Sequence, residues 1–225
     1  MSTIDVYLEI GTKKAFASAS DWPGWCRSGR DEHSALQALF ECGPRYARVV
    51  QGLGIKAPAG IGDLRVVERL PGNKTTDFGA PDAIADAEQQ APDEAEMTRL
   101  SNVLRACWLA FDAASQAAAG KELARGPRGG GRDLEGVTRH VMNSTASYLS
   151  LIGGKIKLDE TAELSAEWAR TNQAVLVALA HAVLHGIPEH GPRGGRTWPA
   201  RYYVRRLAWH VLDHVWEIED RVISR

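Results

Sequence analysis

The stretch that decides the fold lies near the end of the chain, where residues 199–223 read PARYYVRRLAWHVLDHVWEIEDRVI. Proline suits the first turn of a helix, where its missing N–H would have no intrahelical partner. The stretch therefore predicts a helix from Pro199 to about Ile223. His210 and His214 are four residues apart in it, which places both imidazoles on one helix face, about one turn apart. Two imidazoles so placed can chelate one metal ion.

Three more long helices are predicted before this one, each opened by an aspartate that can cap its first turn. The connections between them carry no strand signal. Four amphipathic helices in succession are typical of a four-helix bundle, which we expect over residues 93–225. The predicted caps and helices are Asp93 with Glu94 to about Ala119, Asp133 with Leu134 to about Leu151, and Asp159 with Glu160 to His185.

The chain before residue 80 has a different pattern. Val6–Ile10 and Ala15–Ala19 predict a β-hairpin, a helix is expected from Glu32 to about Leu53, and Leu64–Leu70 predicts another strand. We therefore expect a small α/β domain over residues 1–80. Residues 81–92 are small, acidic and interrupted by proline, which predicts a linker. The expected fold class is α+β, with the α/β domain followed by the bundle.

Composition excludes several classes of protein. The 225 residues carry a net charge of −1, with 27 basic and 28 acidic side chains, so the whole chain has no electrostatic attraction to nucleic acid or to a membrane surface. No run approaches the length of a membrane-spanning helix, and the first residues lack the features of a signal peptide. The three cysteines form no CxxC, which fits a reducing cytoplasm and excludes a cysteine-based zinc site.

The seven histidines are therefore the metal-ligand candidates that remain. His140 lies on the inward stripe of the predicted 134–151 helix, and we expect it to supply a third ligand beside His210 and His214. Three neutral imidazoles with open coordination positions are typical of catalytic sites. Glu217 shares the face of His210 and His214, so it is a candidate fourth ligand, acceptor for an imidazole N–H, or general base.

Other interpretations of the histidines stay open. An HxxxH pattern is common by chance, and His181 and His185 form a second one. They lie in the last turns of their helix, where the helix dipole favours histidine, so we interpret them as capping or surface residues. His33 and His190 lie at a helix start and in a loop, and we assign them no function.

Arginines accompany two similar glycine-rich loops. GPRGG occurs at 126–130 and again at 191–195, and each copy is soon followed by another arginine. Flexible loops are one interpretation, and an anion-binding rim for carboxylate or phosphate is the other. In an up-down-up-down bundle the two loops would lie at the same end, whereas a crossover topology would place them at opposite ends. The sequence does not decide between these topologies. The arginines are Arg128, Arg132, Arg193 and Arg196.

Two other features have both a structural and a functional interpretation. Arg201, Arg205 and Arg206 form a basic cluster, which is typical of a solvated helix face, with a carboxylate clamp as the alternative. Cys26 has Arg27 beside it, which would activate the thiol. A half-buried position in the turn is the other interpretation of Cys26, and the one we favour.

The pattern of His140 followed by His210-xxx-His214 resembles the DinB/YfiT-like superfamily of four-helix-bundle metalloproteins, over about residues 90–225. That family carries one histidine on its second helix and HxxxH on its last. The resemblance implies that these three histidines bind a divalent metal ion such as zinc, nickel or iron. Its characterised members include thiol-dependent transferases and isomerases, in which the metal activates a thiol. A low-molecular-weight thiol is therefore an implied cofactor.

The first 60 residues resemble a HicB-like fold. The turn DWPGWCRSG at 21–29 follows that family's pattern with one inserted residue before Cys26, and a helix begins after Asp31. The resemblance implies the fold of this part. We do not transfer the antitoxin role of that family, because a bundle follows here in place of a DNA-binding segment.

The sequence thus predicts a metal-dependent enzyme, a transferase or isomerase, acting on a small-molecule substrate. Glu217 is the candidate catalytic residue, and Arg128, Arg132, Arg193, Arg196 and Tyr148 are the candidate substrate-binding residues. The alternative is a non-catalytic metal-binding or protein-interaction module. The last helix also allows a homodimer, with an interface on the side of this helix away from the histidines. The residues of that interface would be Trp209, Val211, Trp216 and Val222.

Overall fold

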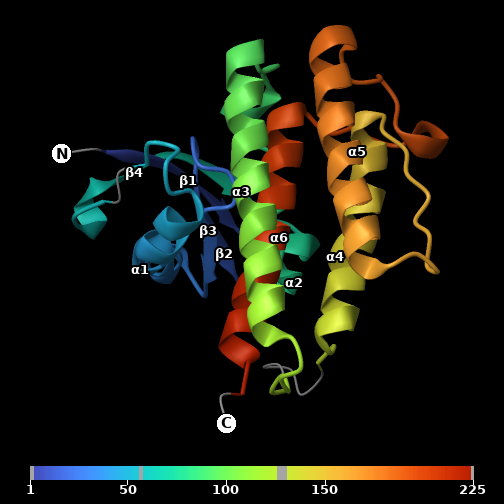
Figure 1. Cartoon of the computed structure of the whole chain (residues 1–225). Coiled ribbons are helices and arrows are strands. Elements are labelled where there is room, and N and C mark those ends of the chain that lie inside the picture. Colours follow the sequence, from blue (N-terminus) through green and yellow to red (C-terminus); the bar gives the residue numbers. More distant parts are fainter. Residues whose placement is uncertain (1–2, 56–57, 126–130, 224–225) are drawn as a thin grey trace.

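The computed structural model describes residues 3–55, 58–125 and 131–223. Within these ranges the chain has a mixed α and β fold, with one four-stranded sheet and six α-helices. Figure 1 shows the sheet and its helix on one side and four long helices on the other. The mixed class agrees with the sequence.

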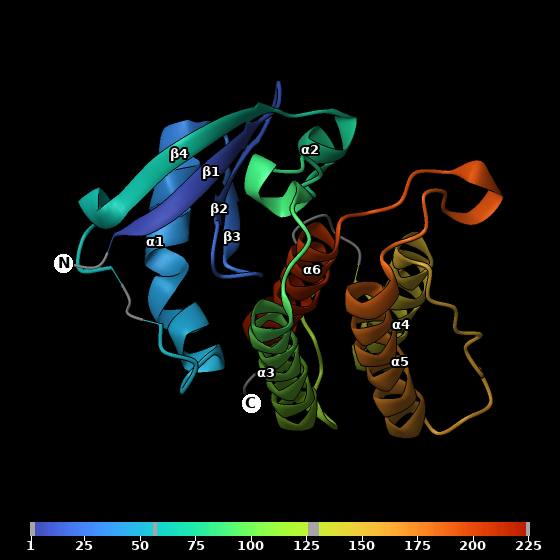
Figure 2. The ribbon, with the colours of Figure 1, turned by 90° about the horizontal axis from the view of Figure 1, so that it is seen from above.

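The sheet consists of β1 (Ile4–Ile10), β2 (Ala15–Ala19), β3 (Cys26–Gly29) and β4 (Leu64–Pro71), in the order β3-β2-β1-β4. The β1–β2 and β2–β3 pairs are antiparallel, and β1–β4 is parallel. A parallel pair requires a crossover connection, which α1 (Glu32–Val49) provides between β3 and β4. Figure 2 shows α1 lying along one face of the sheet. The sequence predicted the hairpin and β4 but not β3.

Helix α1 begins where the sequence predicted and ends at Val49, before the predicted Leu53. The Asp31 carboxylate accepts a hydrogen bond from the Ser34 backbone and caps the first turn. The turn that precedes β3 is fixed beneath this helix, because Trp25 donates to the Leu39 carbonyl at 2.9 Å. Tyr46 stacks on Trp25 with ring centroids 5.5 Å apart. The buried side chains of Trp25 and Tyr46 thus stabilise the packing of α1 against the sheet.

The segment predicted as a linker is anchored on both sides. It follows the short helix α2 (Lys74–Phe78) and includes a 3₁₀ turn at Asp86–Gln89. The Glu9 carboxylate of β1 accepts hydrogen bonds from the backbone of Asp82 and Ala83. Glu88 forms an ion pair with Arg205 at 2.5 Å, and both side chains are buried. These contacts hold the connection against the sheet and against the last helix.

Four long helices make up the rest of the chain: α3 (Glu94–Ala118), α4 (Leu134–Leu149), α5 (Leu164–His185) and α6 (Ala200–Arg221). Their bounds lie close to those predicted, except at the start of α5. Glu163, not Asp159, caps α5, and its carboxylate accepts from the backbone of Ser165 and Ala166. Asp159 instead closes a turn with Thr161.

The helices follow a crossover topology. In Figure 1, α3 and α6 run in one direction and α4 and α5 run in the other, with residues 153–163 crossing along the outside between α4 and α5. Consistently, the end of α4 meets the start of α6, where Trp198 N–H donates to the Leu151 carbonyl. The end of α3 and the start of α4 therefore lie at the opposite end of the helices from the connection between α5 and α6, as the crossover alternative predicted.

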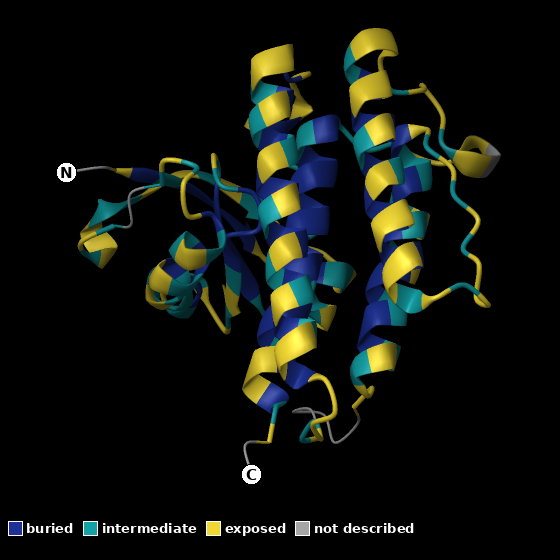
Figure 3. Cartoon of the chain, viewed as in Figure 1, coloured by how far each residue is buried: buried dark blue, intermediate teal, exposed yellow. Residues whose placement is uncertain are grey.

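Helix α6 is the centre of the molecule. Figure 3 shows it buried along its length, and most of its 22 residues are buried. Trp209 meets Phe16 of β2 edge-on with ring centroids 6.2 Å apart, so one side of α6 covers the sheet while others pack on α3 and α4. Trp209, Val211 and Trp216 are therefore buried within the chain, where they form no exposed interface. A homodimer remains a prediction.

Among the described helices, none combines the length and apolarity that crossing a membrane requires.

Candidate metal centre

The three predicted histidines come together where α4 faces α6. His140 projects from α4, His210 and His214 project from α6, and one ring nitrogen of each lies within 4.8 Å of the others. The Nε2 atoms of His140 and His210 are 3.3 Å apart. Two nitrogens bound to one tetrahedral zinc ion at its usual bond length would be about 3.4 Å apart. The spacing of these two side chains therefore fits a shared ion.

The environment keeps two of these imidazoles neutral. Burial is the main cause that lowers the pKa of His140 to about 4, and the nearby His214 adds to it. Burial also lowers the pKa of His210 well below its usual value. Neutral imidazole is the form that binds a metal ion, so these two side chains are available as ligands without losing a proton.

Glu217 orients the third histidine. Its Oε2 lies 2.6 Å from Nδ1 of His214, and the hydrogen bond from His214 is the largest cause that lowers the pKa of Glu217 to about 2. An ionised carboxylate can only accept, so His214 donates from Nδ1, which leaves Nε2 as the nitrogen that can bind a metal ion. Of the three roles considered for Glu217, this contact favours the acceptor for an imidazole N–H. A general-base role remains a prediction.

Arg221 completes this arrangement and was not singled out from the sequence. Its guanidinium pairs with Oε1 of Glu217 and also donates to the carbonyls of Ala124 and Arg132. The contact ties the end of α6 to the connection between α3 and α4. The signal was available, because Glu217 and Arg221 have the i, i+4 spacing of helical ion pairs.

Aromatic rings cover the side of the cluster nearest the start of α6. Tyr148 lies with its ring 5.8 Å from that of His210, and Trp198 lies 5.0 Å from Tyr148. Trp209 is the other aromatic neighbour, 6.2 Å from His210. The structure thus places Tyr148, a predicted substrate-binding residue, beside the histidines.

Of the four predicted arginines, the structure describes the side chains of two, Arg132 and Arg196. Arg132 lies near the cluster, because its charge contributes to the lowered pKa of His140 and His210. Arg196 lies at the opposite end of the helices. Arg128 falls outside the described residues, and for Arg193 only the backbone is described, in a 3₁₀ turn at Pro192–Gly194. The two described side chains, Arg132 and Arg196, do not meet, and an anion-binding rim formed by all four arginines stays a prediction.

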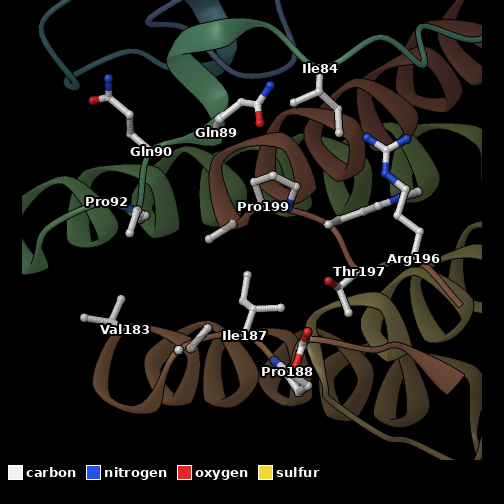
Figure 4. Close-up of a pocket in the computed structure, with 16 residues that line it drawn as sticks. Ile84, Gln89, Gln90, Pro92, Val183, Ile187, Pro188, Arg196, Thr197 and Pro199 are labelled. Carbon is white, nitrogen blue, oxygen red and sulfur yellow. The ribbon is translucent and has the colours of Figure 1, made fainter. Parts of the chain in front are cut away.

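A pocket of about 540 Å³ lies at the Arg196 end, between the segment before α3, the end of α5 and the segment before α6. Figure 4 shows both apolar and polar walls, with Val183 and Ile187 on the α5 side, Gln89 and Gln90 on the side of the segment before α3, and Arg196 and Thr197 at one end. The pocket does not include the histidines. Trp198 lines it and packs against Tyr148 with the two rings tilted by 45°, and Tyr148 in turn contacts His210. Two aromatic rings therefore separate the pocket from the cluster.

The remaining histidines agree with their interpretation as surface residues, whereas Cys26 is fully buried at the start of β3 and not half-buried in the turn. His181 and His185 lie next to each other on the exposed face of α5, and His33 and His190 are also exposed. Cys26 is buried, and burial raises the pKa of its thiol to about 12, an effect that Arg27 only weakly opposes. A thiol with this pKa is protonated and unreactive at neutral pH.

Within the described residues, one group of three side chains has the spacing of metal ligands, namely His140, His210 and His214. Comparison with protein-family models, curated proteins and solved structures gives no match to this chain.

Proposed function

We propose that the chain is a divalent-metal-dependent enzyme in which His140, His210 and His214 bind the ion. The observation that carries this proposal is the convergence of three imidazoles from two helices, with two Nε2 atoms 3.3 Å apart. Three neutral nitrogen ligands leave at least one coordination position for a ligand from solution. The donor set suits zinc, nickel or iron, and excludes a preference for the hard ions magnesium and calcium.

A divalent ion held there would act as a Lewis acid that lowers the pKa of a bound thiol or water. The chain's own residues would fix the geometry for this. Glu217 accepts a hydrogen bond from Nδ1 of His214 and so fixes the orientation of that ring, and Arg221 forms an ion pair with Glu217. The partly buried ring of Tyr148 and the buried ring of Trp209 would limit the access of water.

The reaction that we propose is a transferase or isomerase reaction with a small-molecule substrate and a low-molecular-weight thiol. This part rests on the resemblance to the DinB/YfiT-like four-helix bundles. The order of the helices and the positions of the three histidines support it, with His140 on the second long helix and the HxxxH on the last.

We further propose that residues 1–80 form a HicB-like domain. The order of its elements supports this, with a strand pair, the turn at 21–29 and a capped helix. The role of this domain in our proposal is structural, because its sheet covers α6 opposite the histidines.

The test is metal analysis of purified protein after reconstitution. We expect about one equivalent of zinc, nickel or iron in the wild type and a loss of that metal in His210→Ala. The matched control is His181→Ala, which removes one histidine of the exposed HxxxH. If His210→Ala retains as much metal as His181→Ala, the assignment of the site is wrong.

Activity is a separate measurement. Metal-loaded wild type would be screened with thiols and electrophilic substrates, and turnover should be absent in His210→Ala. A protein that binds one metal ion but turns over no substrate would instead be a metal-binding module.

A further inference from the structure

Arg206 of α6 is a buried cation without a hydrogen-bond partner. It is 7% exposed, and its Nε and Nη1 donate to no atom within the described ranges. Its two basic neighbours differ from it. Arg201 pairs with Glu96, and Arg205 pairs with Glu88. The interpretation of this cluster as a solvated face is therefore wrong for Arg205 and Arg206, which are both buried.

An unpaired buried guanidinium is unfavourable, because arginine stays charged in proteins and loses its hydration without compensation. The rings around it compensate only in part. The Trp209 ring lies 4.8 Å and the Tyr148 ring 5.7 Å from the guanidinium carbon. Cation–π contact uses the face of the guanidinium and leaves the N–H groups at its edge unsatisfied. A methionine would fill this position at less cost in stability.

The position of Arg206 links it to the three histidines. Arg206, His210 and His214 follow one another at intervals of four residues on α6, so they share one helix face. Tyr148 contacts both Arg206 and His210. The charge of Arg206 also contributes to the lowered pKa of His210. The unpaired cation is thus directly beside the candidate metal centre.

The acidic side chains near the cluster are engaged elsewhere. Glu217 is bound to His214 and Arg221. Asp213 lies 3.8 Å from Arg27 and is half-exposed. Neither carboxylate has a contact with Arg206 in the described structure. Buried polar groups left without partners at a site require an explanation, and a missing ligand is one.

We propose that Arg206 binds the carboxylate group of a ligand that lies beside the three histidines. The ligand class is a small carboxylate with an aromatic or apolar body, because Tyr148 and Trp209 supply the neighbouring surface. Arginine pairs with carboxylate through strong charge-assisted hydrogen bonds. That this ligand is the substrate rests on the function proposed above.

The test uses benzoate as the probe and benzamide as its neutral counterpart, with affinities measured by calorimetry. We expect wild type to bind benzoate and to discriminate against benzamide. Arg206→Met should weaken benzoate binding about tenfold or more, the loss of one charge-assisted hydrogen bond, and Arg206→Lys should restore part of it. Arg201→Met is the control and should bind as wild type does. Equal benzoate affinities in wild type and Arg206→Met would overturn the proposal.

Measuring both metal-free and metal-loaded protein separates this proposal from the proposed function. Benzoate binding that depends on Arg206 in a protein without metal would support the anion site and leave the metalloenzyme unsupported. One equivalent of bound metal, together with benzoate binding that Arg206→Met does not change, would support the metal site and contradict the anion site.

Thermal unfolding provides a second measurement. Without benzoate, Arg206→Met should unfold at the wild-type temperature or above it. Benzoate should raise the Tm of wild type but not that of Arg206→Met. Arg205→Met should instead lower the Tm, because it leaves Glu88 buried without its partner. A large decrease in Tm in Arg206→Met would show a structural role and overturn the proposal.

Discussion

Glu217 lies one turn beyond His214 on α6, and its Oε2 is 2.6 Å from the Nδ1 of that histidine. The contact determines which nitrogen of His214 faces His140 and His210. A carboxylate that accepts a hydrogen bond from a metal-binding imidazole orients that imidazole and raises its basicity. The orientation of His214 in the candidate metal centre thus depends on Glu217, which binds His214 on the side away from the other two histidines.

Replacing this carboxylate should weaken metal binding. For Glu217→Gln we expect a loss of about 10–100-fold in zinc affinity, the usual effect of removing such a partner, measured by competition with a chelator. Glu219→Gln is the control, since Glu219 also binds an arginine, Arg45, but at the exposed side of α6. Equal affinities in the two variants would contradict an orienting role for Glu217.

The ion pair between Glu88 and Arg205 should be important for stability. Both side chains are buried, 9% and 4% exposed, so Arg205→Met should cost about 3–5 kcal/mol because it leaves a buried charge unpaired. Adding Glu88→Leu should recover most of this loss. For comparison, Arg65→Met removes an exposed pair with Asp5 and should cost under about 1 kcal/mol. Urea unfolding measures all four proteins. A double variant as unstable as Arg205→Met would contradict the argument.

Gly24 should be intolerant of a side chain for two reasons. Its φ of +91° is in the left-handed region, and a Cβ there would lie 3.0 Å from Leu212 Cδ1 and 3.1 Å from Ala208 Cβ on α6. Gly52 has a similar φ of +88° with open space around it. Gly52→Ala should cost about 1 kcal/mol from backbone strain, and Gly24→Ala about 1–3 kcal/mol more from overpacking. Equal unfolding midpoints would mean that the turn at Gly24 moves away from α6 without cost.

Thiol labelling should distinguish the three cysteines. Cys42 is half-buried, whereas Cys26 and Cys107 are fully buried and their pKa values are raised by burial, that of Cys26 to about 12. A raised thiol pKa means less thiolate at a given pH, so at pH 8 native protein should react with iodoacetamide at Cys42 first, and labelling of Cys26 should increase as the pH rises. Peptide mass spectrometry identifies the sites, and denatured protein should label at all three. Fast labelling of Cys26 at pH 8 would refute its buried assignment.

The sequence predicted the elements that depend on local pattern. The start of α1 after Asp31 and the extents of α3 and α4 follow from capping residues and helical periodicity. The start of α5 was misplaced because both Asp159 and Glu163 can accept backbone N–H groups, and only packing selects between them. Strand β3 was missed because CRSG has no alternation, and it is a strand only because it pairs with β2.

The candidate site was predicted in part. Spacing placed His210 and His214 on one face, and the inward stripe of the second long helix indicated His140. The same reasoning failed for the arginines, because whether Arg205 or Arg206 is buried depends on which element covers α6 on that side. The 81–92 segment covers Arg205 through Glu88, and α4 lies against Arg206 through Tyr148. No local pattern encodes either contact. The crossover between α4 and α5 was also left open, since loop composition does not set helix direction.

The central burial of α6 has a consequence for synthesis. Ribosomes make this helix after every other described element, yet the sheet, α3 and α4 all bury their apolar surfaces against it. The nascent chain must therefore hold these surfaces exposed until α6 emerges, which makes folding of the whole molecule a late event and gives chaperones a defined interval in which to bind. Any chain whose translation stops before Ala200 would lack the central helix α6 and, with it, two of the three histidines of the candidate metal centre. Quality control would therefore detect such a chain as unfolded rather than as inactive.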